Sequence, residues 1–143
     1  MASVVFHAFE QYQEKKEIRL FKSANKNYKD GMQLRDFIYV KDAVEFVMFF
    51  LKNNHISGLF NSGTGRAQSF NDLANAVLIN TKGDKSNIKY IDMPDDLKGK
   101  YQYYTEATLD KISETGFNLQ FKNLEEGVND YMQNYLLTSD RYA

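Results

Sequence analysis

The sequence has no cysteine and no tryptophan, and only one proline and two histidines among its 143 residues. Without cysteine the chain can form no disulfide and can offer no thiolate as a nucleophile or metal ligand. Two histidines and scattered carboxylates make no recognisable ligand cluster, so we expect no metal site. The absence of cysteine fits a reducing compartment, and the first residues lack the basic segment and apolar core of a secretion signal. We therefore expect a cytoplasmic protein.

An excess of charge of one sign and long apolar runs are lacking as well. The 18 Lys and Arg residues nearly balance 19 Asp and Glu residues, for a net charge of −1. This balance argues against a protein that binds nucleic acid or an anionic membrane surface. No apolar run reaches the roughly 18 residues of a membrane-spanning helix. The length of 143 residues predicts a single domain, residues 1–143, and the 43% hydrophobic content predicts a core of its own.

The stretch 35–74 gives the clearest pattern. Residues 35–40 (RDFIYV) read as a short strand, and the apolar residues that follow recur at helical spacing and mark one face of a helix: Val40, Ala43, Val44, Val47, Met48 and Leu51. Residues 58–61 predict a second strand, residues 63–65 (Gly-Thr-Gly) a turn, and Ser69 with Asp72 the capped start of another helix. This order of elements is typical of an α/β fold with a parallel sheet.

Weaker patterns complete the expected secondary structure. We expect helices over 1–14 and 105–115, and a last helix that begins with a capping box of Asn123 and Glu126. Strands are expected over 18–22 and 87–92, with a polar loop over 23–33. Residues 138–143 are expected to fray.

Several of these segments resemble a known enzyme family. RDFIYVKDAV (35–44), GLFNSGTG (58–65) and SFNDLA (69–74) resemble the C-terminal half of extended short-chain dehydrogenases/reductases that modify nucleotide sugars. MASVVFH (1–7) and LKGKYQ (97–102) narrow the resemblance to the ADP-L-glycero-D-manno-heptose 6-epimerases. The resemblance implies that the chain is the C-terminal substrate-binding part of an incomplete Rossmann-type fold. Residues 35–65 would supply the last strand and helix elements that join a missing N-terminal nucleotide-binding half.

The resemblance also implies a set of residues that bind an ADP-sugar substrate: His7, Phe21, Lys22, Ser23, Ala24, Arg35 and Tyr101. Arg35 is the strongest of these candidates, because a planar guanidinium offers a fork of donors that suits a diphosphate. The resemblance assigns Tyr101 a hydrogen bond to the substrate phosphates. Where the family typically has Glu-Gly-Ser, this chain has Lys22, Ser23 and Ala24. We expect Arg35, Tyr101 and His7 to share one hollow.

The implied activity is NADP-dependent oxidation and re-reduction at C6 of an ADP-linked heptose, a precursor of the lipopolysaccharide core. In such enzymes the catalytic tyrosine and lysine and the glycine fingerprint for the cofactor lie upstream of the matched region. We therefore expect this chain to contain no catalytic residue, to hold no cofactor and to be inactive alone. The whole protein is expected to be a homo-oligomer. Two alternatives are another nucleotide-sugar epimerase or dehydratase, and a non-catalytic nucleotide-sugar binding or assembly module.

Four local features allow two interpretations each. Tyr12 and Lys16 have the four-residue spacing of a catalytic pair, but no strand and glycine loop precede them, which favours an accidental match. The glycines at 63–65 could approach a phosphate, although a tight turn is favoured. Residues 98–104 mix cations with tyrosines, as in single-strand nucleic-acid binding, which the net charge disfavours. His7 is a packed histidine by its position alone and a substrate contact by the resemblance.

Overall fold

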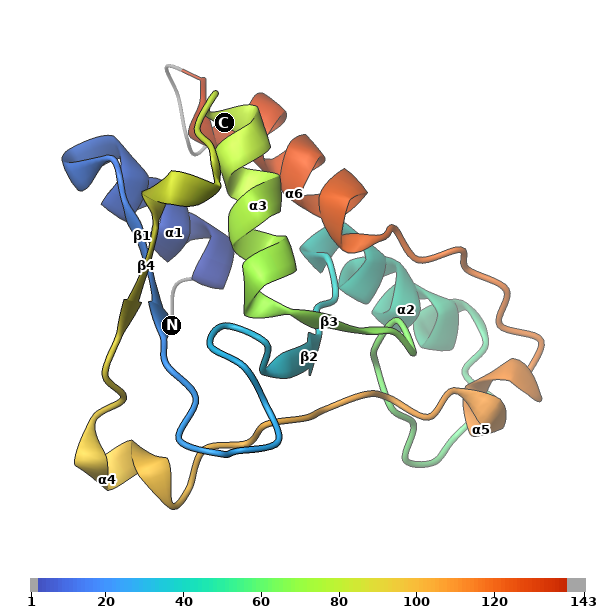
Figure 1. The fold of residues 1–143 in the computed structure, drawn as a ribbon. Coiled ribbons are helices and arrows are strands. Elements are labelled where there is room, and N and C mark those ends of the chain that lie inside the picture. The colour runs from blue at the N-terminus through green and yellow to red at the C-terminus, as the bar shows by residue number, and fades with distance from the viewer. Residues whose placement is uncertain (1–2, 139–143) are drawn as a thin grey trace.

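The structure, a computed structural model, describes residues 3–138 (Figure 1). The expected fraying of 138–143 therefore falls outside the described residues, except for Thr138. The helices are α1 Val4–Lys15, α2 Val40–Lys52, α3 Phe70–Asn80, α4 Asp95–Lys98, α5 Asp110–Ser113 and α6 Leu124–Tyr131, followed by a π-helical turn Met132–Leu136. The strands are β1 Ile18–Phe21, β2 Leu34–Asp36, β3 Ala67–Ser69 and β4 Ile88–Ile91, with a 3-10 turn Lys85–Asn87 before β4.

The strands form two small sheets. β1 pairs with β4 in parallel, with Ile18 opposite Ile88. β2 pairs with β3 in antiparallel orientation, with Leu34 opposite Ser69. The parallel pairing predicted within 35–74 was therefore wrong, and residues 58–61 form no strand. Phe60 packs instead on Phe50 of α2, with 4.9 Å between ring centroids.

The core lies between α1, α3, α6 and the strand β1. Its fully buried side chains include Phe9, Ile18, Leu73, Leu78 and Met132. Burying such side chains contributes roughly 1.5–3 kcal/mol each to folding, before the entropic cost of ordering the chain. The helix starts follow the predicted capping: the Ser69–Asp72 box opens α3 and the Asn123–Glu126 box opens α6.

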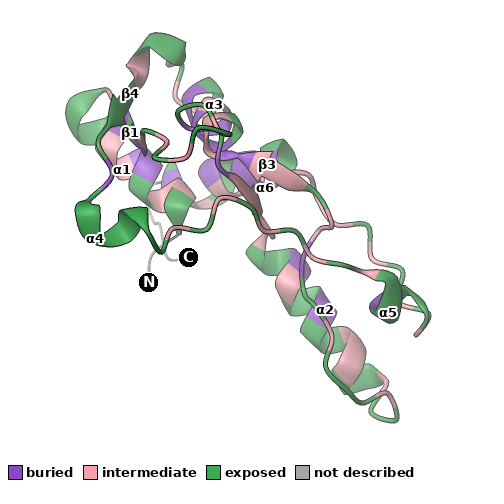
Figure 2. Ribbon diagram, turned by 60° about the horizontal axis from the view of Figure 1, so that its bottom comes forward, coloured by how far each residue is buried: buried purple, intermediate pink, exposed green. Residues whose placement is uncertain are grey.

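Helix α2 lies on an arm that extends from this body, with α5 beside it (Figure 2). The helix ends at Lys52, and Asn53 is its C-cap residue. Its buried side packs through Phe46 and Phe50, and Phe46 meets the ring of Phe117 at 5.3 Å. The apolar face that the sequence pattern marks is exposed: Val40 is 63% exposed, Val44 54%, Val47 56%, Met48 37% and Leu51 68%.

The segment 101–109 is extended rather than helical, so the helix predicted over 105–115 is reduced to α5. This segment runs beside β2. The backbone N–H of Leu34 donates to the carbonyl of Tyr103 at 2.9 Å, and the N–H of Thr105 donates to the carbonyl of Leu34 at 3.2 Å. These pairings use the backbone groups that a helix would need for itself, which keeps the segment extended.

Candidate functional site

The site begins with Arg35, which β2 and the adjoining extended segment hold half-buried. Its guanidinium donates to the carbonyl of Leu34 at 2.7 Å and to the carbonyl of Gln102. The guanidinium carbon also lies 5.3 Å from the centre of the Tyr101 ring and 5.8 Å from that of Phe70. Two carbonyls and two aromatic rings therefore fix the direction of a charged group, which is the arrangement that a specific anion site requires.

Aromatic rings extend this site from Tyr101 toward β1. The ring of Tyr101 meets Phe21 edge-on at 6.3 Å and Tyr103 at 5.4 Å. Burial raises the pKa of the Tyr101 phenol, and the nearby Arg35 charge opposes that rise. The phenol is therefore neutral at pH 7 and can donate a hydrogen bond. We call Arg35, Phe21, Phe70, Tyr101 and Tyr103 the Arg35 cluster.

The loop that follows β1 is tied both to this cluster and to itself. The backbone N–H of Ala24 donates to the Tyr103 hydroxyl at 3.1 Å. The N–H of Ser23 donates to Asp30 at 2.8 Å. The ammonium of Lys22 pairs with Asp92 at 3.0 Å, and both side chains are exposed. The structure therefore places Phe21, Ala24, Arg35 and Tyr101 in one connected group, with Lys22 and Ser23 at its margin.

His7 lies apart from this group. It is exposed on α1, where its backbone N–H donates to Ser3 at 3.1 Å and its ring meets Phe6 at 6.1 Å. Among residues 3–138, no recorded contact joins His7 to the Arg35 cluster. Three surface cavities, of about 380, 310 and 470 Å³, are lined by other residues. None of the three is the shared hollow expected for Arg35, Tyr101 and His7, and their roles as substrate ligands stay a prediction.

Asp36, next to Arg35 in β2, is the second charged residue of the site. Its carboxylate accepts hydrogen bonds from the backbone N–H of Thr64 at 2.8 Å, the Thr64 hydroxyl at 2.6 Å, Gly65 N–H at 2.9 Å and Ala107 N–H at 3.0 Å. Burial alone would raise the pKa of Asp36, but these four donors outweigh it and hold the pKa below its ordinary value. The carboxylate thus joins β2, the turn at 63–65 and the extended segment at 107.

Comparisons with known proteins show what this chain is similar to. Residues 1–63 match the NAD dependent epimerase/dehydratase family. The chain is 50% identical to an ADP-L-glycero-D-manno-heptose-6-epimerase of Fusobacterium nucleatum over 147 aligned residues, which cover 99% of the chain and 44% of that protein. The chain is therefore similar, over nearly all of its residues, to part of such epimerases. It spans less than half the length of the curated relatives that it matches.

Solved structures of two enzymes named for nucleotide-sugar substrates share the fold. The Helicobacter pylori ADP-L-glycero-D-manno-heptose-6-epimerase superimposes with a TM-score of 0.69 at 26% identity, over 92% of this chain and 36% of that one. A dTDP-glucose 4,6-dehydratase from Bacillus anthracis superimposes with a TM-score of 0.73 at 16% identity, over 96% of this chain and 40% of that one. The second likeness shows the fold alone.

Two motifs typical of short-chain dehydrogenases/reductases have structural explanations here. The backbone N–H groups of Thr64 and Gly65 donate to Asp36, so they are not available to a phosphate. Gly63 and Gly65 therefore form a tight turn, as favoured from the sequence. Tyr12 is only 8% exposed within the core, with the Lys16 ammonium 5.0 Å from its ring centre. This burial supports the interpretation that the tyrosine–lysine spacing is accidental.

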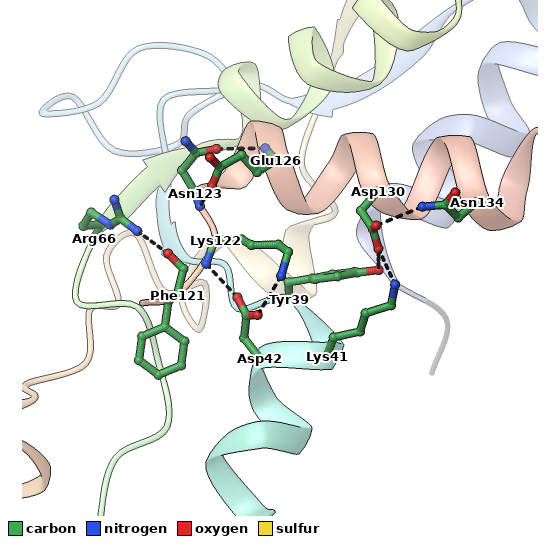
Figure 3. A network of polar contacts seen from close by, with 10 residues as sticks. All are labelled: Tyr39, Lys41, Asp42, Arg66, Phe121, Lys122, Asn123, Glu126, Asp130 and Asn134. Atoms are coloured by element: carbon green, nitrogen blue, oxygen red, sulfur yellow. Dashed lines mark hydrogen bonds and ion pairs between the residues drawn. The ribbon is translucent and has the colours of Figure 1, made fainter. Parts of the chain in front are cut away.

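A polar network that the sequence did not reveal attaches α2 to α6 (Figure 3). Asp130 accepts from the Tyr39 hydroxyl and pairs with the Lys41 ammonium at 2.7 Å. Asp42, only 3% exposed, accepts from the backbone N–H of Lys122 at 2.7 Å and lies 3.3 Å from its ammonium. Hydrogen bonds from Lys41 and Tyr39 lower the pKa of Asp130, while burial and Asp130 raise that of Tyr39. The partners lie 80 to 91 positions apart, which no local pattern could connect.

Neither a metal-ligand group nor a membrane-spanning helix is present in residues 3–138. Over residues 3–138 there is no group of three or more His, Asp or Glu side chains that could hold a metal ion. Over the same residues no helix has the length and apolar character needed to cross a membrane.

Proposed function

We propose that this chain is the substrate-binding part of an ADP-L-glycero-D-manno-heptose 6-epimerase that supplies a precursor of the lipopolysaccharide core. The Arg35 cluster is the observation that carries the proposal. Two of the five N–H groups of the guanidinium donate to carbonyls of residues 34 and 102, so the others can reach phosphate oxygens. The 50% identity to a curated epimerase of this name supports the choice of sugar.

The proposed contacts follow from position for the Arg35 cluster and the loop after β1, and from the family resemblance for His7. Arg35 and the neutral phenol of Tyr101 bind the diphosphate, and Phe21 packs beside Tyr101 on the nucleotide side of the site. Lys22, Ser23 and Ala24 line the edge of the site through the loop after β1. His7 contacts the substrate from an opposite wall that is complete only in the whole protein.

The glycine turn at 63–65 is the candidate for a phosphate loop that the sequence raises. Because Asp36 occupies the N–H groups of Thr64 and Gly65, this turn does not suit a cofactor phosphate. NADP and the catalytic tyrosine and lysine therefore belong, in our proposal, to the missing N-terminal half. The cofactor's chemistry there is reversible hydride transfer at C6 of the sugar. This chain alone has no catalytic residue, holds no cofactor and is inactive.

We also propose that the missing nucleotide-binding half packs on the arm. The apolar stripe of α2, which is Val40, Val44, Val47, Met48 and Leu51, is exposed, and Leu59 in the segment after α2 is 86% exposed. Monomeric soluble proteins rarely expose an apolar surface of this extent, so it marks an interface. Residues 35–65 would join the nucleotide-binding half there. The whole protein would be a cytoplasmic homo-oligomer.

Turnover assays on the whole protein and on this chain test the proposal. The whole protein with NADP should epimerise ADP-heptose and not UDP-sugars, whereas this chain with NADP should show no turnover. Preference for UDP-sugars would favour another epimerase or dehydratase. Binding of ADP-sugar without turnover by the whole protein would favour a non-catalytic binding module. Turnover by this chain alone would contradict its assignment as the substrate-binding part only.

A further inference from the structure

Asp36 lies next to Arg35 in β2, yet its carboxylate points to the other side of the strand and binds two distant segments. It accepts four hydrogen bonds, from both N–H groups of the turn at 64 and 65, from the Thr64 hydroxyl and from Ala107. An acceptor with this many partners fixes those segments relative to each other, because each bond to a charged group is strong and directional.

The segment held at Ala107 is the one that carries Tyr101. Between the two, the Leu34–Tyr103 and Thr105–Leu34 backbone bonds continue the same ladder along β2. At Ala107 the ladder goes on through the Asp36 side chain in place of a backbone carbonyl. Asp36 therefore makes the last hydrogen bond between β2 and this segment. At the start of the same segment, the Tyr101 ring centre lies 5.3 Å from the Arg35 guanidinium carbon.

The packing around Gly63 shows how closely the three segments approach. A Cβ atom at this position would lie 2.5 Å from the Ala107 Cβ and 2.6 Å from an Asp36 carboxylate oxygen. Real Cβ atoms do not tolerate such distances, so only glycine allows the turn to seat against both residues. The glycine turn thus serves to bring backbone donors to Asp36.

We infer that Asp36 is a positioning residue for the nucleotide site: by binding the turn at 63–65 and Ala107, it holds segment 101–107 so that Tyr101 lies against the Arg35 guanidinium. The inference rests on the proposed function only where it predicts ligand affinity. Its structural part concerns the pairing of segment 101–107 with β2 and is independent of any ligand.

A double-mutant cycle with ADP as the probe tests the link between Asp36 and Tyr101. Calorimetric titration of the whole protein should show that Asp36→Asn weakens ADP binding about tenfold, but less than about twofold when Tyr101→Ala is also present. The same loss in both backgrounds, or no loss in either, would overturn the inference. Gly63→Ala should reproduce the effect of Asp36→Asn, since the added methyl separates the same segments.

Asp42→Asn is the matched control. Asp42 also binds a distant backbone N–H, that of Lys122, but it belongs to the link between α2 and residue 122. It should lower stability and change ADP affinity less than about twofold. An equal loss of ADP affinity in Asp42→Asn would show a general effect of destabilisation and would overturn the positioning role of Asp36.

Amide hydrogen exchange separates this inference from the proposed function. In Asp36→Asn the N–H groups of Leu34 and Thr105 should exchange at least about tenfold faster, although neither bonds to Asp36 itself. Unchanged exchange would overturn the inference. Arg35→Ala could bind ADP as tightly as wild-type protein while exchange at residues 34 and 105 still rises in Asp36→Asn. In that case the proposed function would fail and the positioning role of Asp36 would stand.

Discussion

The body formed by α1, α3 and α6 buries aliphatic side chains where these helices meet, whereas the arm that carries α2 leaves most of the aliphatic side chains of that helix exposed. Leu73 and Val77 of α3 are 1% and 0% exposed, while Val44 and Leu51 of α2 are 54% and 68% exposed. Phenylalanine rings and two polar links at Asp42 and Asp130 hold the arm. The body is thus complete within this chain, and the arm presents the surface that we assign to the missing half.

This comparison predicts that the largest loss of stability will come from the body. Leu73→Ala leaves a cavity between α1, α3 and α6 and should lower the free energy of unfolding by about 2–5 kcal/mol. Chemical denaturation of the chain measures this change. Ile79→Ala, on the exposed side of the same helix, is the control and should change stability by less than about 0.5 kcal/mol. Equal losses at the two positions would contradict the assignment of the core.

A smaller loss should come from the polar link of the arm. Asp42→Asn removes the charge that accepts from the backbone and ammonium of Lys122, and should cost about 1–3 kcal/mol. Because Asp42 links only α2 and residue 122, hydrogen exchange should rise in the arm and remain slow at Val77. Uniform exchange across both regions would mean that arm and body unfold as one unit.

The second link should make the arm sensitive to acid. Lys41 and Tyr39 hold the pKa of Asp130 below its ordinary value, so its contribution is present at neutral pH and is lost as the pH falls through that lowered pKa. Wild-type protein should therefore lose stability in acid more steeply than Asp130→Asn. The difference in the free energy of unfolding between wild-type protein and Asp130→Asn should shrink as the pH falls. Asp96→Asn, on α4, is the control. A difference that stays constant with pH would contradict an ionised Asp130 in this link.

The smallest effect on stability, and a clear effect on association, should come from the exposed stripe. Val47→Lys on α2 should change the free energy of unfolding by less than about 0.5 kcal/mol, because the side chain is 56% exposed. In the isolated chain it should reduce self-association measured by sedimentation, since it places a charge within an apolar surface. If Val47→Lys self-associates as wild-type chain does, the surface that mediates self-association lies elsewhere.

The sequence predicted those parts of the fold that depend on neighbouring residues. The capping pairs at Ser69 and Asn123 are local, and both helices begin where these residues indicated. Strand pairing depends on distant segments, which is why β2 pairs with β3 and not with the strand expected at 58–61. The pattern on α2 identified a helix correctly, but its apolar face is exposed because nothing within the described residues covers it.

The candidate site shows the same division. Family resemblance selected Arg35, Phe21 and Tyr101, which the structure brings together. It could not show the four donors to Asp36, because Ala107 lies 71 positions away in the sequence. Periodicity suggested a helix over 105–115 that would have excluded this contact. The extended form of 101–109 depends on its pairing with β2, which only the three-dimensional structure reveals.

The most direct test of the central claim is the affinity of the whole protein for ADP-heptose when Arg35 is replaced by lysine. Lysine keeps the positive charge but loses the planar fork that two carbonyls and two rings hold in place. We predict that Arg35→Lys binds ADP-heptose at least about tenfold more weakly, whereas Arg66→Lys binds it as wild-type protein does, since the Arg66 guanidinium donates to the carbonyl of Phe121. Equal affinity of Arg35→Lys and wild-type protein would contradict the account.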